Sequence, residues 1–145
     1  MNSLELANYA LLHNPWRARM HLVSNTAVAA AGVIPFSAID FDPGGACTTG
    51  AAAKYTVQQD GYYLVSISAQ NITTAVVFIV ELAQNGSGIA FGSDTSASGV
   101  SEISVLGTIV KCASGDTIQA LSSATTTIVG ATSTTYLSIS WIAPA

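Results

Sequence analysis

Charged side chains are scarce in this chain. Of its 145 residues, four are Lys or Arg and eight are Asp or Glu, so only 8% are charged, against about 25% in typical globular domains. Four basic side chains cannot neutralise a run of phosphates, which argues against nucleic acid as a partner. Half of the residues are hydrophobic. This composition excludes a disordered chain, because disorder needs low hydrophobicity and high net charge.

Long apolar runs and cysteine patterns are also missing. The longest apolar run covers residues 75–80 and ends at Glu81, far short of the ~20 residues that a membrane-spanning helix needs. The first residues do not combine a basic start with an apolar stretch, so we expect no secretory signal. Cys47 and Cys112 are compatible with two free thiols or with one disulfide. A zinc site is not expected, because only two distant histidines could complete it.

Groups for catalysis are equally sparse. His13 and His21 lie in the N-terminal part, and no Gly-x-Ser-x-Gly nucleophile elbow is present. Asp40 and Asp42 could form a glycosidase pair, but the adjacent Pro-Gly-Gly sequence favours a turn-capping role. We therefore expect no enzymatic activity, no cofactor and no metal.

What the sequence does contain, from residue 31 onward, is a series of short apolar runs separated by turn signals about ten residues apart. Residues 62–69 alternate between apolar and polar side chains, which is typical of a strand with one buried face. Asn85-Gly86 is typical of a hairpin turn. About eight such strands, with no helical period after residue 15, predict an all-β antiparallel sandwich over residues 31–145.

Residues 1–30 differ from this sandwich in charge and period. Two arginines against one glutamate give them a net charge of +1, whereas two lysines against seven acidic residues give residues 31–145 a charge of −5. Leucines and alanines three and four residues apart predict a short helix before Pro15. Because Arg and Trp are favoured at interface centres, we interpret residues 1–30 as an attachment arm that uses Leu4, Leu11, Leu12, Trp16, Arg17 and Arg19. The alternative is that this segment folds back over its own sandwich.

Residues 75–82 are apolar on both faces of an expected strand. A strand of this kind is buried on both sides, yet the second face of an antiparallel sandwich normally meets water. A partner chain could cover that face. The low charge of the whole chain points the same way, since much of the surface could be buried against other copies.

The order of these motifs resembles the jelly-roll heads of the complement C1q and tumour necrosis factor superfamily. It is still more similar to bacteriophage virion proteins that carry such a head. The resemblance covers residues 34–143 and rests on a set of motifs in a fixed order: Phe41-Asp42-Pro43-Gly44-Gly45, Tyr55-Thr56, Gly61-Tyr62-Tyr63-Leu64-Val65-Ser66, Asn85-Gly86, Gly115-Asp116-Thr117-Ile118 and Thr135-Tyr136-Leu137-Ser138-Ile139. It implies a two-sheet jelly roll that assembles as a tight trimer and has a binding or structural role.

From the residues and this resemblance together we expect a structural virion protein, a homotrimeric knob held on a phage capsid or tail by its arm. Its partners would be its own copies and other virion proteins. The alternative is a receptor-binding tip that recognises a host-surface glycan or protein. The residues predicted to form the trimer interface are Tyr62, Val77, Phe78 and Ile79.

Overall fold

The structure is a computed structural model, which describes Glu5 and residues 14–72, 77–95 and 101–145. Within these ranges the chain forms thirteen strands and one short 3-10 turn, Gly50–Ala52. The strands are β1 (Arg17–His21), β2 (Thr26–Val28), β3 (Gly32–Val33), β4 (Ala38–Phe41), β5 (Cys47–Thr48), β6 (Lys54–Thr56), β7 (Gly61–Asn71), β8 (Val77–Gln84), β9 (Ser87–Thr95), β10 (Ser101–Cys112), β11 (Thr117–Ser122), β12 (Thr126–Ile128) and β13 (Tyr136–Ala143). None of the described helical segments is long and apolar enough to cross a membrane.

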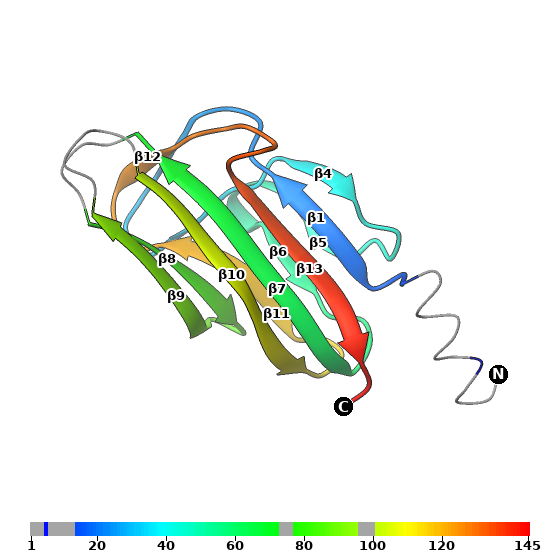
Figure 1. Cartoon of the computed structure of the whole chain (residues 1–145). Coiled ribbons are helices and arrows are strands. Elements are labelled where there is room, and N and C mark those ends of the chain that lie inside the picture. The colour runs from blue at the N-terminus through cyan, green and yellow to red at the C-terminus, as the bar shows by residue number, and fades with distance from the viewer. Residues whose placement is uncertain (1–4, 6–13, 73–76, 96–100) are drawn as a thin grey trace.

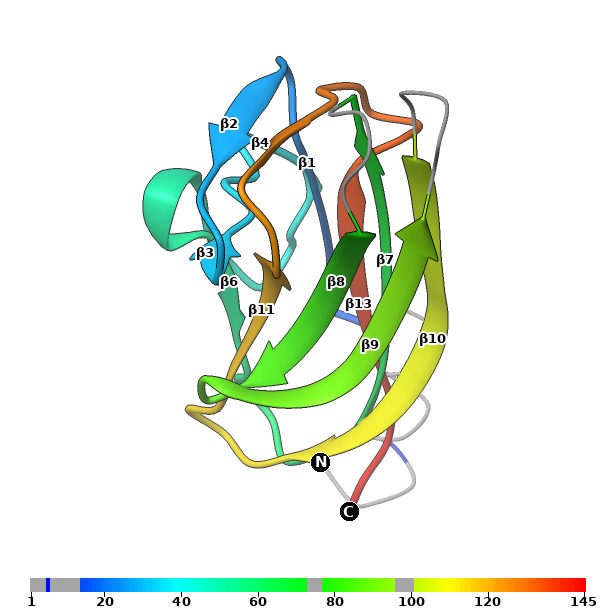
Figure 2. The ribbon, with the colours of Figure 1, turned by 90° about the vertical axis from the view of Figure 1, so that its left-hand side faces the viewer.

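The strands form two antiparallel sheets packed face to face. The seven-stranded sheet has the order β2-β12-β7-β13-β1-β4, with β10 paired to the free side of β7. The six-stranded sheet has the order β5-β6-β11-β8-β9, with β3 paired to β11. Figure 1 shows β10, β7, β13 and β1 in the front layer, ahead of β11 and β6. Figure 2 shows both layers from the side, with β9 beside β10 where the two sheets meet.

The core forms from the period-two pattern of the longest strands. On β7, alternate residues from Tyr63 to Ala69 are fully or almost fully buried. On β8, Phe78, Val80 and Leu82 point into the same core and have no exposed surface. The predicted antiparallel sandwich and the inward face of residues 62–69 are therefore confirmed. The hairpin at Asn85-Gly86 is confirmed as well, since φ is positive at both residues, as a tight β-hairpin turn requires.

The N-terminal boundary of the sandwich differs from the expected one. Residues 17–21 form β1, which pairs with β13 on one side and β4 on the other. Residues 26–28 form β2, which pairs with β12. Ala18, Met20 and Leu22 are buried in the common core. The second half of the predicted arm of residues 1–30 is thus part of the jelly roll, because its apolar residues Ala18, Met20 and Leu22 alternate with the period of a strand.

The polar residues Ser93 to Thr95 also belong to a strand. β9 extends through Thr95, so these three residues continue the hairpin strand opposite Val77–Ile79. Ladder pairing with a long, apolar neighbour outweighs the weak strand propensity of Ser and Asp here. Residues 96–99 lie outside the described part of the chain.

Candidate interaction surface on the seven-stranded sheet

The outer face of the seven-stranded sheet carries exposed apolar side chains and two arginines. Because side chains alternate along a strand, the buried set on β7 leaves Tyr62, Leu64, Ser66 and Ser68 on the outside. The register of the neighbouring strands then sets the rows across this face. Leu64 lies beside Ser140 of β13 and Ile109 of β10. We call this surface the outer sheet face, and none of the other described strands covers it (Figure 1).

The middle of the outer sheet face is flat. Its two central strands, β7 and β13, contribute Ser66, Ser68, Ser138 and Ser140 there. Ser68 is nearly buried and donates a hydrogen bond to the Thr134 carbonyl at 2.9 Å. Short hydroxyl side chains leave room for the side chains of a neighbouring molecule to approach closely. The low relief therefore suits packing against another protein surface.

Apolar side chains gather at the end of the outer sheet face that contains the start of β7. The members are partly exposed: Tyr62 38%, Leu64 42%, Ile109 61% and Ile142 44%. Leu64 lies across Gly107 of β10, where an added Cβ would come within 2.5 Å of its Cδ1. The glycine thus lets the leucine lie flat on the sheet. We call these four residues the apolar patch.

Two arginines and a histidine lie on β1, across the same face from the apolar patch. Arg17, Arg19 and His21 alternate along β1 and point outward together. Arg19 lies 4.2 Å above the Tyr136 ring and donates a hydrogen bond to the Thr132 carbonyl at 2.8 Å. These contacts hold Arg19 in one orientation on its own protomer.

Asp40 on β4 joins this cationic group. Its carboxylate lies 3.3 Å from Arg19 Nε and 2.8 Å from His21 Nδ1. Neither of these two contacts has the geometry of a hydrogen bond. Each is therefore a close contact between an acidic and a basic group, without an aligned hydrogen bond. His21 adds to the attraction only when it is protonated. The Asp40 carboxylate therefore compensates the charge of Arg19. One further cation on β1 is not compensated in this way.

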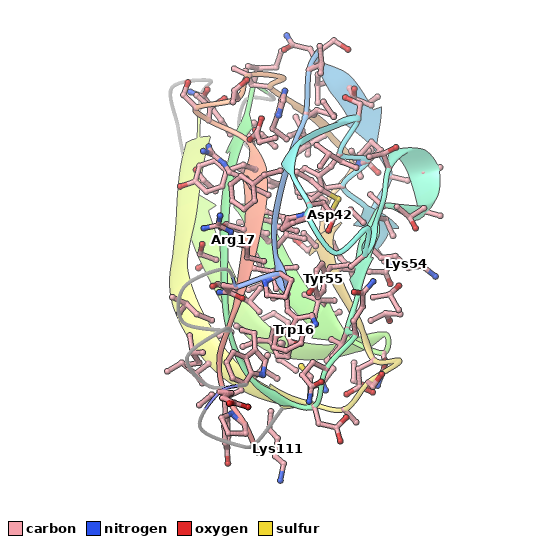
Figure 3. All side chains as sticks on the ribbon, turned by 90° about the vertical axis from the view of Figure 1, so that its right-hand side faces the viewer. Trp16, Arg17, Asp42, Lys54, Tyr55 and Lys111 are labelled. Atoms are coloured by element: carbon pink, nitrogen blue, oxygen red, sulfur yellow. The ribbon has the colours of Figure 1, made fainter. Side chains whose placement is uncertain are left out.

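That cation is Arg17. Its guanidinium lies 5.6 Å from the centre of the Phe41 ring, a cation–π distance. Among the described residues it has no ion pair and no hydrogen bond through its side chain. Figure 3 shows Arg17 on the outer side of β1, whereas Trp16 and Tyr55 point toward the interior.

Trp16 packs on its own protomer. Its ring meets the Trp141 ring edge-on, with the centroids 5.3 Å apart. The Trp141 amide donates a hydrogen bond to the Trp16 carbonyl at 3.0 Å. The adjacent Asn14 donates to Ser140 Oγ at 2.9 Å and to the Trp141 carbonyl at 3.1 Å. The structure thus agrees with the second interpretation of Trp16, in which this part of the chain folds over its own sandwich.

The residues predicted to form the trimer interface lie in three different places. Tyr62 belongs to the apolar patch. Val77 and Ile79 lie on the outer face of the other sheet. Phe78 lies in the protomer's own core with no exposed surface, so it cannot touch another copy directly. The reason is the alternation of β8: a strand that is apolar on both faces still turns one of them inward.

The predicted attachment residues lie partly outside the described chain. Leu4, Leu11 and Leu12 lie outside the described residues. Arg17 and Arg19 do reach one surface, but only Arg17 is left for a partner. The sequence interpretation missed Phe41 and Tyr136, which lie under these arginines. The sequence does contain the alternation along β1 and the aromatic residues near β4 and β13. It does not contain the pairing of these strands, which brings the rings under the arginines.

Asp40 and Asp42 have different roles. Asp42 Oδ2 accepts a hydrogen bond from the Cys47 amide at 2.7 Å, which confirms the expected turn-capping role. Asp40 instead lies on β4 and faces the arginines. Within the described part of the chain, no serine hydroxyl or cysteine thiol donates a hydrogen bond to the His21 ring. The described residues also contain no group of three or more His, Cys, Asp or Glu placed to hold a metal ion.

Both cysteines are free thiols, so the disulfide alternative is not realised in this structure. Burial is the main cause that raises the pKa of Cys47 from 9.0 to about 12, and the nearby Asp42 adds to it. Burial likewise raises the pKa of Cys112 to about 11. A thiol that stays protonated is a poor nucleophile and a poor metal ligand.

The two curled antiparallel sheets superpose on those of solved structures. The globular domain of zebrafish complement 1qA superposes with a TM-score of 0.73 over 89% of this chain and 98% of that chain, at 10% sequence identity. Eiger TNF from S. frugiperda gives a TM-score of 0.77 over 89% of this chain and 93% of that chain, at 12% identity. The chain has the jelly-roll fold of the C1q and TNF domains. Murine APRIL shares this C1q/TNF jelly roll, with a TM-score of 0.70 over 87% of this chain and 98% of that chain, at 12% identity.

Sequence comparison adds nothing to this result. No protein-family model matches the chain, and no curated protein sequence matches it. At 10–12% identity the likeness concerns the C1q/TNF jelly roll itself.

Proposed function

We propose that the chain is a structural virion protein of a bacteriophage, a homotrimeric jelly-roll knob on the capsid or tail. The observation that carries the self-association is the apolar patch on the outer sheet face. Tyr62, Leu64, Ile109 and Ile142 expose apolar surface side by side on a face with little relief. Contiguous exposed apolar patches on soluble proteins mark interaction sites, and the fold exposes this one on a broad, uncovered sheet.

Closed cyclic assembly requires two different complementary patches on each protomer, unless the symmetry is twofold. The outer sheet face supplies one patch. The other lies near the β9 edge, where Phe91 is 65% exposed and Val77 is 53% exposed. Edge strands offer unpaired backbone groups that proteins usually protect, and a neighbouring copy would protect β9. A trimer that buries both patches accounts for the low charge of the chain.

The composition of the chain also supports the phage role. The low charge suits a protein that is surrounded by copies of itself and by a particle surface. Residues 1–13 precede the first strand and are the remaining candidate for the attachment segment, with Leu4, Leu11 and Leu12 on it. A structural role of this kind requires no catalytic group, no cofactor and no metal. The protein would then be found in the virion.

Light scattering after size exclusion tests the assembly. The wild-type protein should have about three times the protomer mass of 14.8 kDa. Leu64→Asp should reduce this mass to that of a monomer, because a charge buried in the patch would be unpaired. Val23→Asp is the matched control, since Val23 is an exposed apolar residue outside both patches and its replacement should leave the mass unchanged. A wild-type monomer at every concentration would overturn the trimer.

Imaging of labelled protein tests the location. Label on capsid or tail of purified particles would support the structural role. Label bound to host cells in the absence of particles would instead support the alternative of a receptor-binding tip. Protein absent from both would contradict the virion proposal.

A further inference from the structure

The continuous described chain begins at Asn14, at the edge of the apolar patch. Asn14 donates a hydrogen bond to Ser140 Oγ at 2.9 Å. Ser140 lies beside Leu64 in the strand register, and Ile142 follows further along the same strand. Figure 1 shows the start of β1 next to the end of β13, at the same end of the sheet as the start of β7. Residues 1–13 therefore join the head where the apolar patch begins.

Residues 1–13 are long enough to cross the patch. A helix of this length measures about 20 Å, because each residue adds about 1.5 Å. The patch lies on three neighbouring strands, β13, β7 and β10. Adjacent strands are about 4.8 Å apart, so the patch is about 10 Å wide. A helix that ends beside β13 thus extends over Ile109 on β10.

The sequence of residues 1–13 suits an apolar surface. Leu4, Ala7 and Leu11 recur at intervals of three and four residues, which places them on one side of a helix. Glu5, the described residue of this segment, has helical backbone. An isolated helix of this length is marginal in water, and packing of its apolar side supplies most of its stability. Such a helix needs an apolar surface within its reach.

The charges on the outer sheet face agree with this occupant. Lys111 is exposed on β10 and lies opposite Tyr62 in the register. Arg17 lies across the same face on β1. Residues 1–13 contain one Glu and no Lys or Arg. Opposite charge on two surfaces favours their approach, so the cations of this face favour the N-terminal segment.

We propose that the apolar patch is the docking surface for residues 1–13 of the same chain. Because the segment is tethered at Asn14, its effective concentration at the patch is on the order of millimolar. The docking itself does not depend on assembly. Its consequence rests on the proposed function: the segment and a neighbouring copy cannot occupy the patch together. Binding of the segment to a particle would therefore uncover the patch and promote assembly there.

Disulfide trapping in the full-length chain tests the docking. Ala7→Cys combined with Ile109→Cys should form an intramolecular disulfide in a buffer of oxidised glutathione, and peptide mass spectrometry identifies it. Ala7→Cys combined with Phe41→Cys is the matched control. Phe41 is 42% exposed one strand away from β1, whereas Ile109 lies three strands away on the other side. A segment without a preferred surface would reach position 41 at least as easily, so docking predicts that the pair at positions 7 and 109 forms about tenfold faster.

Two leucine substitutions test the docking through the patch itself. Leu11→Asp puts a charge on the apolar side of the helix and should release the segment, which shifts the methyl NMR signals of Leu64 and Ile109. Leu6→Asp is the matched control, because Leu6 lies about 140° around the helix from Leu11. It should leave these signals in place.

The assembly provides a third measurement. Leu11→Asp should lower the concentration at which the assembly dissociates by about tenfold, because a patch that is open in about one protomer in ten binds about ten times more weakly than one that is always open. Leu6→Asp should leave this concentration unchanged. Light scattering over a dilution series measures both variants.

The outcomes separate the docking from the assembly. Equal trapping at positions 41 and 109, disulfide-linked dimers in place of intramolecular disulfides, or unchanged methyl signals in Leu11→Asp would overturn the docking. Specific trapping with an unchanged dissociation concentration in Leu11→Asp would support the docking and overturn the competition. A wild type and a Leu11→Asp variant that are both monomeric at every concentration would overturn the proposed trimer, and trapping would still decide the docking. Circular dichroism identifies a cysteine variant that fails to fold, and the methyl signals then decide.

Discussion

Two arginines on one strand have different contacts in the tertiary structure, although they are the same type of residue. Arg17 and Arg19 are two positions apart on β1 and point the same way. Arg19 is held by Asp40, Tyr136 and the Thr132 carbonyl, whereas Arg17 has only the Phe41 ring. An arginine that is already bonded within its protomer adds rigidity, and a free one is able to bind a partner.

Phe78 provides a prediction at the residue scale. Phe78→Ala should lower the free energy of unfolding by about 3–5 kcal/mol, because it removes a fully buried aromatic side chain and leaves a cavity. Val77→Ala, its exposed neighbour, should change the stability of the protomer by about 0.5 kcal/mol or less. Urea unfolding followed by fluorescence measures both, at a protein concentration where the wild type is monomeric. Equal losses for the two variants would contradict the inward orientation of Phe78.

The two thiols provide a second prediction. Because burial raises the pKa of Cys47 to about 12 and that of Cys112 to about 11, neither should react with iodoacetamide at pH 8 until urea unfolds the chain. In the unfolded state both thiols ionise near their ordinary pKa of 9.0. Unfolding therefore releases protons between pH 9 and 12, and stability should fall as the pH rises through this window. Thermal melts of the wild type and Cys47→Ala measure the effect, and the variant should show a shallower fall.

At the scale of elements, two turns at one end of the molecule are joined by a single carboxylate. Asp116 in the β10–β11 turn accepts hydrogen bonds from Asn85 Nδ2 at 2.7 Å, Gln84 Nε2 at 2.8 Å and the Ala113 amide at 2.9 Å. Asn85 belongs to the β8–β9 hairpin, so the contact connects this hairpin to the β10–β11 turn. The hydrogen bond from Asn85 is the largest cause that lowers the pKa of Asp116 below its ordinary value.

Asp116→Asn should therefore lower the melting temperature at pH 7. Since the folded state holds the ionised carboxylate, the stabilisation is present above the ordinary pKa of 3.8 and is lost as the pH falls below it. The wild type should thus lose its advantage over the variant as the pH falls below 3.8. Asp60→Asn is the comparison, because Asp60 accepts one hydrogen bond, from the Ser114 amide. A pH-independent difference between wild type and Asp116→Asn would contradict the role of the charge.

At the scale of the whole molecule, the boundary between arm and head decides what a truncation does. β1 lies between β13 and β4 in the seven-stranded sheet, and it contributes Ala18 and Met20 to the core. The jelly roll therefore needs residues from both ends of the chain. An attachment segment that can be removed without loss of the fold has to lie before Asn14.

Two deletions test this boundary. Removal of residues 1–13 should leave a folded head with near-wild-type near-ultraviolet circular dichroism, which no longer joins the particle. Removal of residues 1–24 should abolish folding, because β13 and β4 lose the strand between them and the core loses Met20 and Leu22. A folded product of the longer deletion would show that β1 is dispensable. Normal incorporation of the shorter product would place attachment on the jelly roll.

The sequence by itself determined the class of fold and the inward face of the main strands. Its turns and its period-two pattern are local properties, so residues 62–69 and Asn85-Gly86 could be assigned without any knowledge of their neighbours. The scarcity of charge also followed from composition alone. The order of the motifs indicated a C1q/TNF-like jelly roll, which the superposition confirms.

Only the tertiary structure decided which strands lie side by side, and with this it decided the candidate surface. β1 and β13 pair although more than a hundred residues separate them, so Tyr136 comes under Arg19 and Trp141 against Trp16. No pattern within either strand contains that register, because the backbone hydrogen bonds that align two strands are the same for any residue pair. Physical contact between segments that are far apart in the sequence is what decides which side chains share one face of the molecule.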